Sequence, residues 1–199
     1  MTWINLEGPV YWTLFVTAFL AVAAWESWLP WRALALPAEH RWGRHGLLLL
    51  VSALIQAAVY RVSPVVLASA AAGSRFGLLN KDWAPLGLRC ALAILVIDLG
   101  HYLTHRAFHS FSWLWRVHEV HHSDADYDVS TAVRFHPLEV LLTQGFNLGL
   151  ILLLAPPAAA VFFAEMLAAV VNIFVHANAS LAPGLEQALR KVFVTPGMH

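Results

Sequence analysis

The chain has 199 residues, of which 59% are apolar and 12% charged, and its mean hydropathy is +0.64. This composition excludes an ordinary soluble domain and is typical of a protein embedded in lipid. The formal net charge is zero with histidine neutral, which argues against a polyanionic partner such as nucleic acid. The single cysteine, Cys90, cannot form an internal disulfide.

Apolar runs of membrane-spanning length recur along the chain. No positively charged signal region precedes the first run, so we expect a retained anchor, with tryptophans at its ends as at a membrane interface. The run at 65–73 is too short to cross and predicts an interfacial or re-entrant segment. Pro156 and Pro157 predict a tight hairpin. Five spans are therefore predicted, at about 9–29, 46–60, 86–104, 138–155 and 158–177.

Basic residues in the short loops indicate the orientation of the spans. The 30–45 linker, the 106–137 region and the tail would share one side, which the positive-inside rule makes cytoplasmic. The bias is modest, because the loop 61–85 on the other side also contains three basic residues. The sequence predicts an all-α, integral-membrane helical bundle with a cytoplasmic, histidine-rich helical cap, which we assign to a bacterial inner membrane.

Six of the eleven histidines fall within 22 residues near the end of the third span, as His101, His105 and His109, then His118, His121 and His122. On a helix, residues four apart lie on one face, so both clusters would direct imidazoles to one side. With no cysteine and few carboxylates nearby, the site favours iron, zinc or copper over magnesium or calcium. Coincidental surface histidines are the alternative, but polar clusters beside a span are costly and typical of function.

Two further residues near these clusters each have two interpretations. Asp98, one turn before His101, could orient an imidazole through its second ring nitrogen, or pair with Arg89 or Arg106. His176 follows the last apolar run and is either a further metal ligand or an interfacial histidine.

Other polar residues are less closely tied to a metal site. His136 could support or line the site, and Glu165, costly in lipid, is expected to face a neighbouring helix or a cavity. The acidic run 124–128 lacks the glycine and terminal glutamate of a calcium loop, so a solvated face or a helix N-cap is expected. His40 and His45, in a basic linker, are expected to be solvated.

The motifs, taken together, resemble the fatty acid hydroxylase and sterol desaturase superfamily of integral-membrane di-iron enzymes. The resemblance runs from about residue 90 to the end. The motifs that carry it are Asp98-Leu-Gly-His101-Tyr-Leu-Thr-His105-Arg106-Ala-Phe-His109, Trp115-Arg-Val-His118-Glu-Val-His121-His122-Ser123, Arg134-Phe-His136-Pro-Leu-Glu139, Phe174-Val-His176-Ala-Asn178 and Val194-Thr-Pro196-Gly-Met-His199.

The resemblance implies an oxidoreductase that uses two iron ions and dioxygen to hydroxylate or desaturate a fatty acyl, sterol or related lipid in the bilayer. Electrons would come from an external donor such as a cytochrome or ferredoxin, since no flavin, nicotinamide or haem motif is present. Asp98 would support the site from behind its ligands. Carried over by position, the metal ligands would be His101, His105, His118, His121, His122, His176 and His199, with His109 as a further candidate.

One departure concerns the last motif, which in the family reads His-x-x-His-His after Thr-Pro, whereas this chain stops at the first of those histidines, His199. We expect the 199 residues to be part of a longer protein and not to perform two-metal oxygen chemistry alone. The expected organisation is a membrane anchor region at 1–85 and a fatty acid hydroxylase-like histidine-box domain at 86–199, incomplete at its C-terminus.

Two functions without oxygenase activity remain as alternatives. A membrane metal-binding or transport protein would spread polar ligands through the depth of several spans, yet four of the five predicted spans are nearly bare of them. A haem b electron carrier would place two axial histidines at mid-membrane positions of separate helices. The clustered histidines at the ends of spans argue against both.

Overall fold

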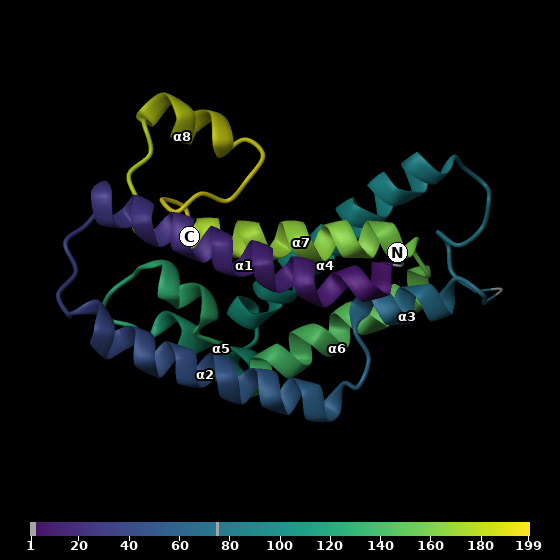
Figure 1. The fold of residues 1–199 in the computed structure, drawn as a ribbon, viewed down its shortest axis with the longest axis horizontal. Helices are drawn as coiled ribbons and strands as arrows, with labels where there is room; N and C mark the ends of the chain where they lie inside the picture. Colours follow the sequence, from purple (N-terminus) through teal and green to yellow (C-terminus); the bar gives the residue numbers. More distant parts are fainter. Residues whose placement is uncertain (1–2, 75) are drawn as a thin grey trace.

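The computed structural model describes residues 3–74 and 76–199, and every regular element in these ranges is helical. The all-α prediction is confirmed. The elements are α1 (Trp3–Trp28), α2 (Ala38–Val59), α3 (Pro64–Ala71), α4 (Leu86–Ser110), α5 (Ser112–His122), the 3-10 turn η1 (Val129–Val133), α6 (Pro137–Leu154), α7 (Ala158–Val175) and α8 (Pro183–Leu189). Figure 1 shows the long helices side by side, with α8 standing away from them.

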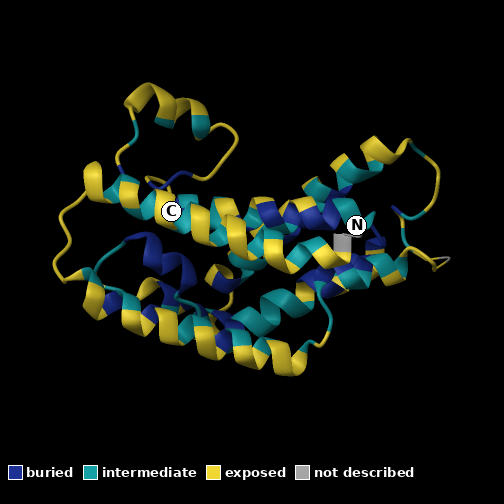
Figure 2. Ribbon diagram, viewed as in Figure 1, coloured by how far each residue is buried: buried dark blue, intermediate teal, exposed yellow. Residues whose placement is uncertain are grey.

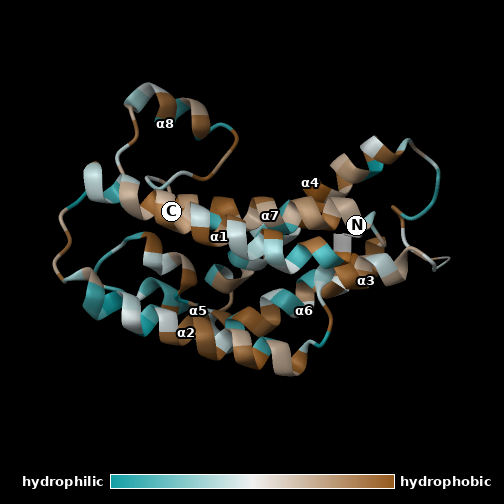
Figure 3. Ribbon diagram, in the orientation of Figure 1, coloured by the Kyte–Doolittle hydropathy of each residue, from teal (hydrophilic) through white to brown (hydrophobic). Residues whose placement is uncertain are grey.

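Five helical segments are long and apolar enough to cross a membrane, which confirms the number predicted and is the pattern of a membrane protein. The second of them begins at Ala38 instead of residue 46, because the polar residues 38–45 continue the helix of the apolar run. Figure 3 shows hydrophobic residues spread along the outer helices. Apolar side chains such as Leu20, Leu54 and Leu95 are more than 60% exposed, as expected of surfaces that face lipid.

The short run at 65–73 forms α3, which lies within the bundle. Ser63 caps its N-terminus by accepting a hydrogen bond from the backbone N–H of Val66, and Pro64 occupies the first turn. Val65 and Ala68 are fully buried, and α3 packs against α6 and α7. The segment is therefore a packed helix that contributes to the core.

The core is centred on α7, which packs against α1, α3 and α4 and is the most buried of the five long apolar segments, with several buried turns in Figure 2. Val65, Ile97, Ile151 and Val161 come from four different helices and are each at most 1% exposed. Gly100 lets α4 approach α6 closely, since a Cβ there would lie 2.8 Å from the side chain of Leu150. This packing fixes the end of α4, where the first histidines lie.

The hairpin predicted at Pro156 and Pro157 is present. Ala155 takes the left-handed conformation with φ of 44° and ends α6, and α7 begins at Ala158. Glu165 on α7 accepts a hydrogen bond of 2.9 Å from the side-chain amide of Asn147 on α6. The prediction that Glu165 faces a neighbouring helix is confirmed.

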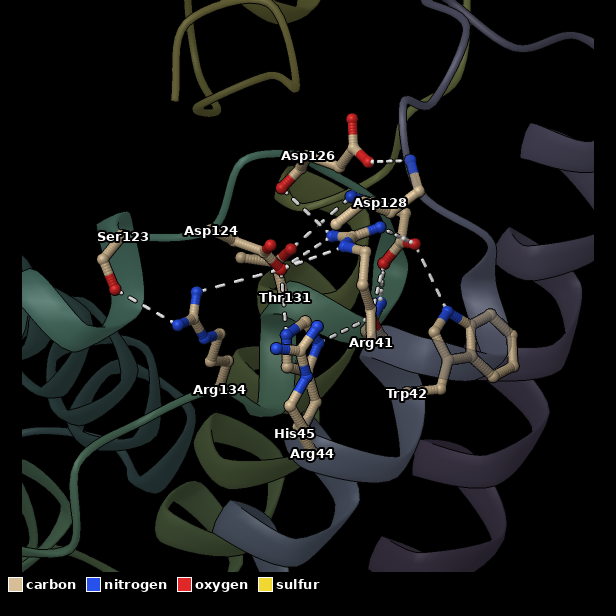
Figure 4. Close-up of polar contacts among 12 residues, drawn as sticks. Arg41, Trp42, Arg44, His45, Ser123, Asp124, Asp126, Asp128, Thr131 and Arg134 are labelled. Atoms are coloured by element: carbon tan, nitrogen blue, oxygen red, sulfur yellow. Dashed lines mark hydrogen bonds and ion pairs between the residues drawn. The ribbon is translucent and has the colours of Figure 1, made fainter.

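A buried ionic cluster joins the start of α2 to the loop that follows α5 (Figure 4). Arg41, with no exposed side-chain surface, forms ion pairs with Asp124 and Asp128, and its guanidinium also donates to the carbonyl of Asp126. His45 lies 2.9 Å from Asp124 and 2.8 Å from the hydroxyl of Ser130. The segment from Asp124 to Ser130 is thus fastened to a transmembrane helix.

This cluster corrects two expectations. His45 is only 3% exposed, so the expectation that it is solvated was wrong, because a linker counted as polar is in fact the first two turns of α2 and packs inward. The acidic run is not a solvated face either, since Asp124 and Asp128 neutralise Arg41. Asp128 does cap η1, so the N-cap expectation is confirmed.

Replacing Arg41 is expected to destabilise the protein strongly. The change Arg41→Met leaves the carboxylates of Asp124 and Asp128 buried without their main counter-ion, which typically costs about 3–5 kcal/mol. The thermal unfolding midpoint in detergent should fall clearly. Arg44→Met is the matched control, because Arg44 is exposed and its guanidinium donates only to the backbone of its own helix. Equal midpoints for the two variants would show that the cluster contributes little.

Candidate metal centre

The first group of histidines forms where α5 folds back against the end of α4. His105 and His109 lie one turn apart at the end of α4, and His118 and His122 lie one turn apart on α5. One ligand nitrogen from each of the four lies within 4.8 Å of the others. The turn between the helices is short, since Phe111 alone separates Ser110 from Ser112, so the two pairs are brought face to face.

A second group joins α5 to two more distant parts of the chain. His121 lies on α5, His176 directly follows α7, and His199 follows the turn at Thr195. Their ligand nitrogens also lie within 4.8 Å of one another. His121 and His122 are neighbours with ring centroids 4.9 Å apart, so the two groups are adjacent and share one helix.

The spacing of the ring nitrogens suits a shared metal ion. The Nε2 atoms of His118 and His109 are 3.2 Å apart, those of His118 and His122 3.1 Å, and those of His121 and His176 3.0 Å. Two imidazole nitrogens bound to one metal at about 2.0–2.1 Å are themselves about 3 Å apart. Each group therefore contains pairs of nitrogens at the separation that coordination requires.

The second ring nitrogens show that the facing nitrogens carry lone pairs. The Nδ1 atom of His176 lies 2.6 Å from the carbonyl oxygen of Asn172, and that of His121 lies 3.3 Å from the carbonyl oxygen of Arg134. A carbonyl only accepts, so each Nδ1 carries the proton and each Nε2 has a free lone pair. Two lone pairs 3.0 Å apart repel each other unless a cation lies between them.

The same logic applies to His199 and His118. The hydroxyl of Tyr127 donates to the carbonyl of Val175, so it accepts from Nδ1 of His199 at 3.2 Å. The Nδ1 atom of His118 donates to the carboxylate of Glu139 at 2.6 Å. Glu139 is 5% exposed and its second oxygen has no hydrogen-bond partner in the described ranges, so a cation bound by His118 would compensate a buried negative charge.

Protonation of these rings near pH 7 is unfavourable, so protons do not supply the positive charge between them. Burial, reinforced by the neighbouring imidazoles, lowers the pKa of His176 to about 3 and that of His122 to about 4. Burial also places the pKa values of His121 and His199 below the usual imidazole range. These four imidazoles are therefore neutral near pH 7, which is the state that binds a transition metal. The donor set fits nitrogen-preferring metals such as iron.

The structure brings together seven of the eight histidines proposed from the sequence as ligands. His101 is in neither group. His101, His105 and His109 lie on successive turns of α4, and α5 folds back against the last of these turns. His105 and His109 lie close enough to the end of α4 to face α5, whereas His101 lies one turn further back. His136 instead caps α6, its Nδ1 accepting from the backbone N–H of Leu138.

Several supporting residues were not identified from the sequence. Glu139 orients His118, and Tyr127 and Asn172 fix His199 and His176. Glu139 belongs to one of the motifs that carry the family resemblance, so the sequence could have marked it as a site residue. Its pairing with His118, 21 residues away, could not be read from the sequence. The contacts of Tyr127 depend on the fold of distant segments and leave no local pattern.

Comparisons with known proteins agree with this geometry. The fatty acid hydroxylase family model matches residues 90–199. Ornithine lipid hydroxylase OlsE of Rhizobium tropici is 27% identical over 118 residues, which are 59% of this chain and 35% of that protein. Alkylglycerol monooxygenase of Homo sapiens is 38% identical over 69 residues, 35% of this chain and 16% of that protein. The chain thus spans about a third or less of these relatives, and no solved structure is significantly similar.

Each of two single variants, one in each histidine group, is expected to lose one of the two metal ions. After anaerobic loading with ferrous iron, the unmodified chain should bind about two ions, and His109→Ala and His176→Ala about one each. Iron per protein is measured by mass spectrometry after desalting. His40→Ala is the control, because His40 is exposed and belongs to neither group. Unchanged iron content in both single variants would contradict the assignment of the groups.

Removing the carboxylate behind His118 is expected to weaken the first group alone. Glu139→Leu abolishes the acceptor that holds Nδ1 of His118, and losses of about 10–100-fold in metal affinity are typical of such changes. Glu139→Gln should lose less, because its amide oxygen can still accept. Competition against a fluorescent chelator gives the affinities. Tight binding of both ions by Glu139→Leu would show that this carboxylate does not support the metal.

Proposed function

The chain belongs to the fatty acid hydroxylase family, and from this premise we propose that it is part of a membrane-bound, oxygen-dependent oxidoreductase that hydroxylates a lipid. The observation that carries the proposal is the pair of adjacent histidine groups, in each of which one ring nitrogen from every histidine lies within 4.8 Å of the others. We propose that His105, His109, His118 and His122 hold one iron ion and that His121, His176 and His199 hold the other. Desaturation of the lipid is the alternative outcome of the same chemistry.

Two bound iron ions would supply the activation of dioxygen needed to break an unactivated C–H bond. In hydroxylation one oxygen atom enters the C–H bond, and the other leaves as water with two electrons and two protons. We propose that a separate redox protein, such as a cytochrome or ferredoxin, delivers the electrons. We further propose that the histidine-bearing end of the bundle is a cap on the cytoplasmic side of a bacterial inner membrane.

The chain's own residues prepare the site for this chemistry. Glu139, Tyr127 and the backbone carbonyls of Asn172 and Arg134 keep the protons on Nδ1 and turn each Nε2 toward the metal. The buried positions of His118, His121 and His176 exclude water from part of the site. The ligands gather at one end of the helices instead of along the spans, which favours an enzyme over a transport pathway.

The proposed domain organisation keeps residues 1–85 as a membrane anchor region and residues 86–199 as the histidine-box domain. The relatives' printed names suggest two lipids to try first, an ornithine lipid and an alkylglycerol. Neither is assigned to this chain by similarity alone.

Oxygen labelling tests the proposal directly. The iron-loaded protein is mixed with the ornithine lipid or the alkylglycerol and a reduced ferredoxin under ¹⁸O₂, and we expect one labelled oxygen atom in the product. The double variant His121→Ala with His176→Ala should give no labelled product, while His40→Ala should match the unmodified protein. The assay is run on these 199 residues, because they bring both histidine groups together, and it therefore also tests the expectation that they lack this chemistry alone. Absence of label from both lipids, although iron is bound, would contradict the proposal.

A further inference from the structure

A polar groove of about 360 Å³ opens beside the two metal groups. It borders one histidine from each group, because His122 belongs to the first and His121 to the second. The residues that determine its chemistry are Arg32, His121, His122, Asp124, Asp126 and Tyr127. A ligand in this groove would therefore lie at the edge of the proposed metal centre.

The charges in the groove leave one side chain free to bind a ligand. Asp124 is paired with Arg41 and His45, and Asp126 accepts hydrogen bonds of 2.9 and 2.8 Å from the backbone N–H groups of residues 35 and 36. Arg32 has no carboxylate partner among the described residues, and its guanidinium lies 4.7 Å over the ring of Trp31. Asp126 keeps its negative charge, so the groove is mixed in charge, and Arg32 is the lining cation that remains free to pair with an anion.

The backbone holds Arg32 in place relative to the metal groups. Its N–H donates to the side-chain carbonyl of Asn178 at 3.1 Å, and its own carbonyl accepts from the side-chain amide of the same residue at 2.9 Å. The N–H of Trp31 donates to the backbone carbonyl of Asn178 at 3.0 Å. Asn178 follows His176 by two residues, so the segment that carries Arg32 is clamped to the segment that carries a proposed ligand.

The groove also lies at the level where lipid head groups are found. Arg32 follows the end of the first apolar helix, at Trp28, by four residues. Trp28 is 81% exposed and Trp31 45%, and tryptophans gather at the boundary between hydrocarbon and water. An anion of a lipid could reach Arg32 here while its chains remain in the bilayer.

We propose that this groove binds the anionic head group, a phosphate or a carboxylate, of a membrane lipid, with Arg32 as its counter-ion. Guanidinium offers two parallel donors to either group, which a neutral head group cannot use equally well. The inference rests on the proposed function in one respect, namely that the lipid held in the groove is the substrate.

Binding of two lipids that differ only in the anion tests the inference without any turnover. Phosphatidic acid and diacylglycerol with identical acyl chains are added to the protein in neutral detergent, and affinities are measured by native mass spectrometry. The protein should prefer phosphatidic acid by about tenfold or more, the usual scale for a hydrogen-bonded charge pair. Arg32→Gln should lose this preference and Arg32→Lys should keep part of it. Arg44→Gln, whose guanidinium lies outside the groove, should keep all of it.

The outcomes separate the inference from the proposed function. Selective, Arg32-dependent binding without ¹⁸O incorporation supports the groove and counts against the oxygenase. If labelled product forms but neither the unmodified protein nor Arg32→Gln distinguishes phosphatidic acid from diacylglycerol, the inference about the groove is overturned and the proposed oxygenase is not. Inorganic phosphate that binds as tightly as phosphatidic acid would overturn the assignment to a lipid. A defect of Arg32→Gln confined to electron transfer from the reduced ferredoxin would instead assign the groove to a protein partner and overturn the inference.

Discussion

The structure depends on one electrostatic constraint, which is that the Nε2 lone pairs of His121 and His176 point at each other across 3.0 Å. This arrangement is unfavourable unless positive charge lies between the rings, and burial makes protonation of His176 costly. The acceptors behind the rings impose it, since two backbone carbonyls fix the protons on Nδ1. A metal ion would remove the repulsion, which supports the proposed metal centre.

The fold places the histidines by holding one short helix, α5, against several segments that are themselves fixed in place. Both groups draw on α5, an 11-residue helix that could not stand alone. It is held by the turn from α4, by Glu139 at the start of α6 and by the Arg41 cluster that anchors the following loop. Glu26, near the end of α1, accepts from the backbone N–H groups of Val129 and Asn178 and so ties that loop to the segment after His176.

The sequence predicted the local features well and the distant contacts poorly. Apolar runs of spanning length and histidines at helical spacing are visible in a short window, so the five long helices and the clusters around residues 101–122 were predictable. Choosing His105 and His109 over His101 required knowing at which turn α5 folds back, which spacing does not specify. The burial of His45 and the pairing of His118 with Glu139 depend on helices that meet only in the fold.

The boundary of the family match divides the site unevenly. All seven grouped histidines lie within residues 90–199, whereas Arg32, Arg41 and Glu26 lie before it. Arg41 and Glu26 hold the segments around the histidine groups in place, and Arg32 lines the groove beside them. None of the three belongs to a histidine group. The proposed metal chemistry and the proposed lipid recognition would thus be carried by different parts of one packed bundle. Under these proposals, exchanging a groove residue such as Arg32 would change the lipid bound without altering a single histidine of the two groups.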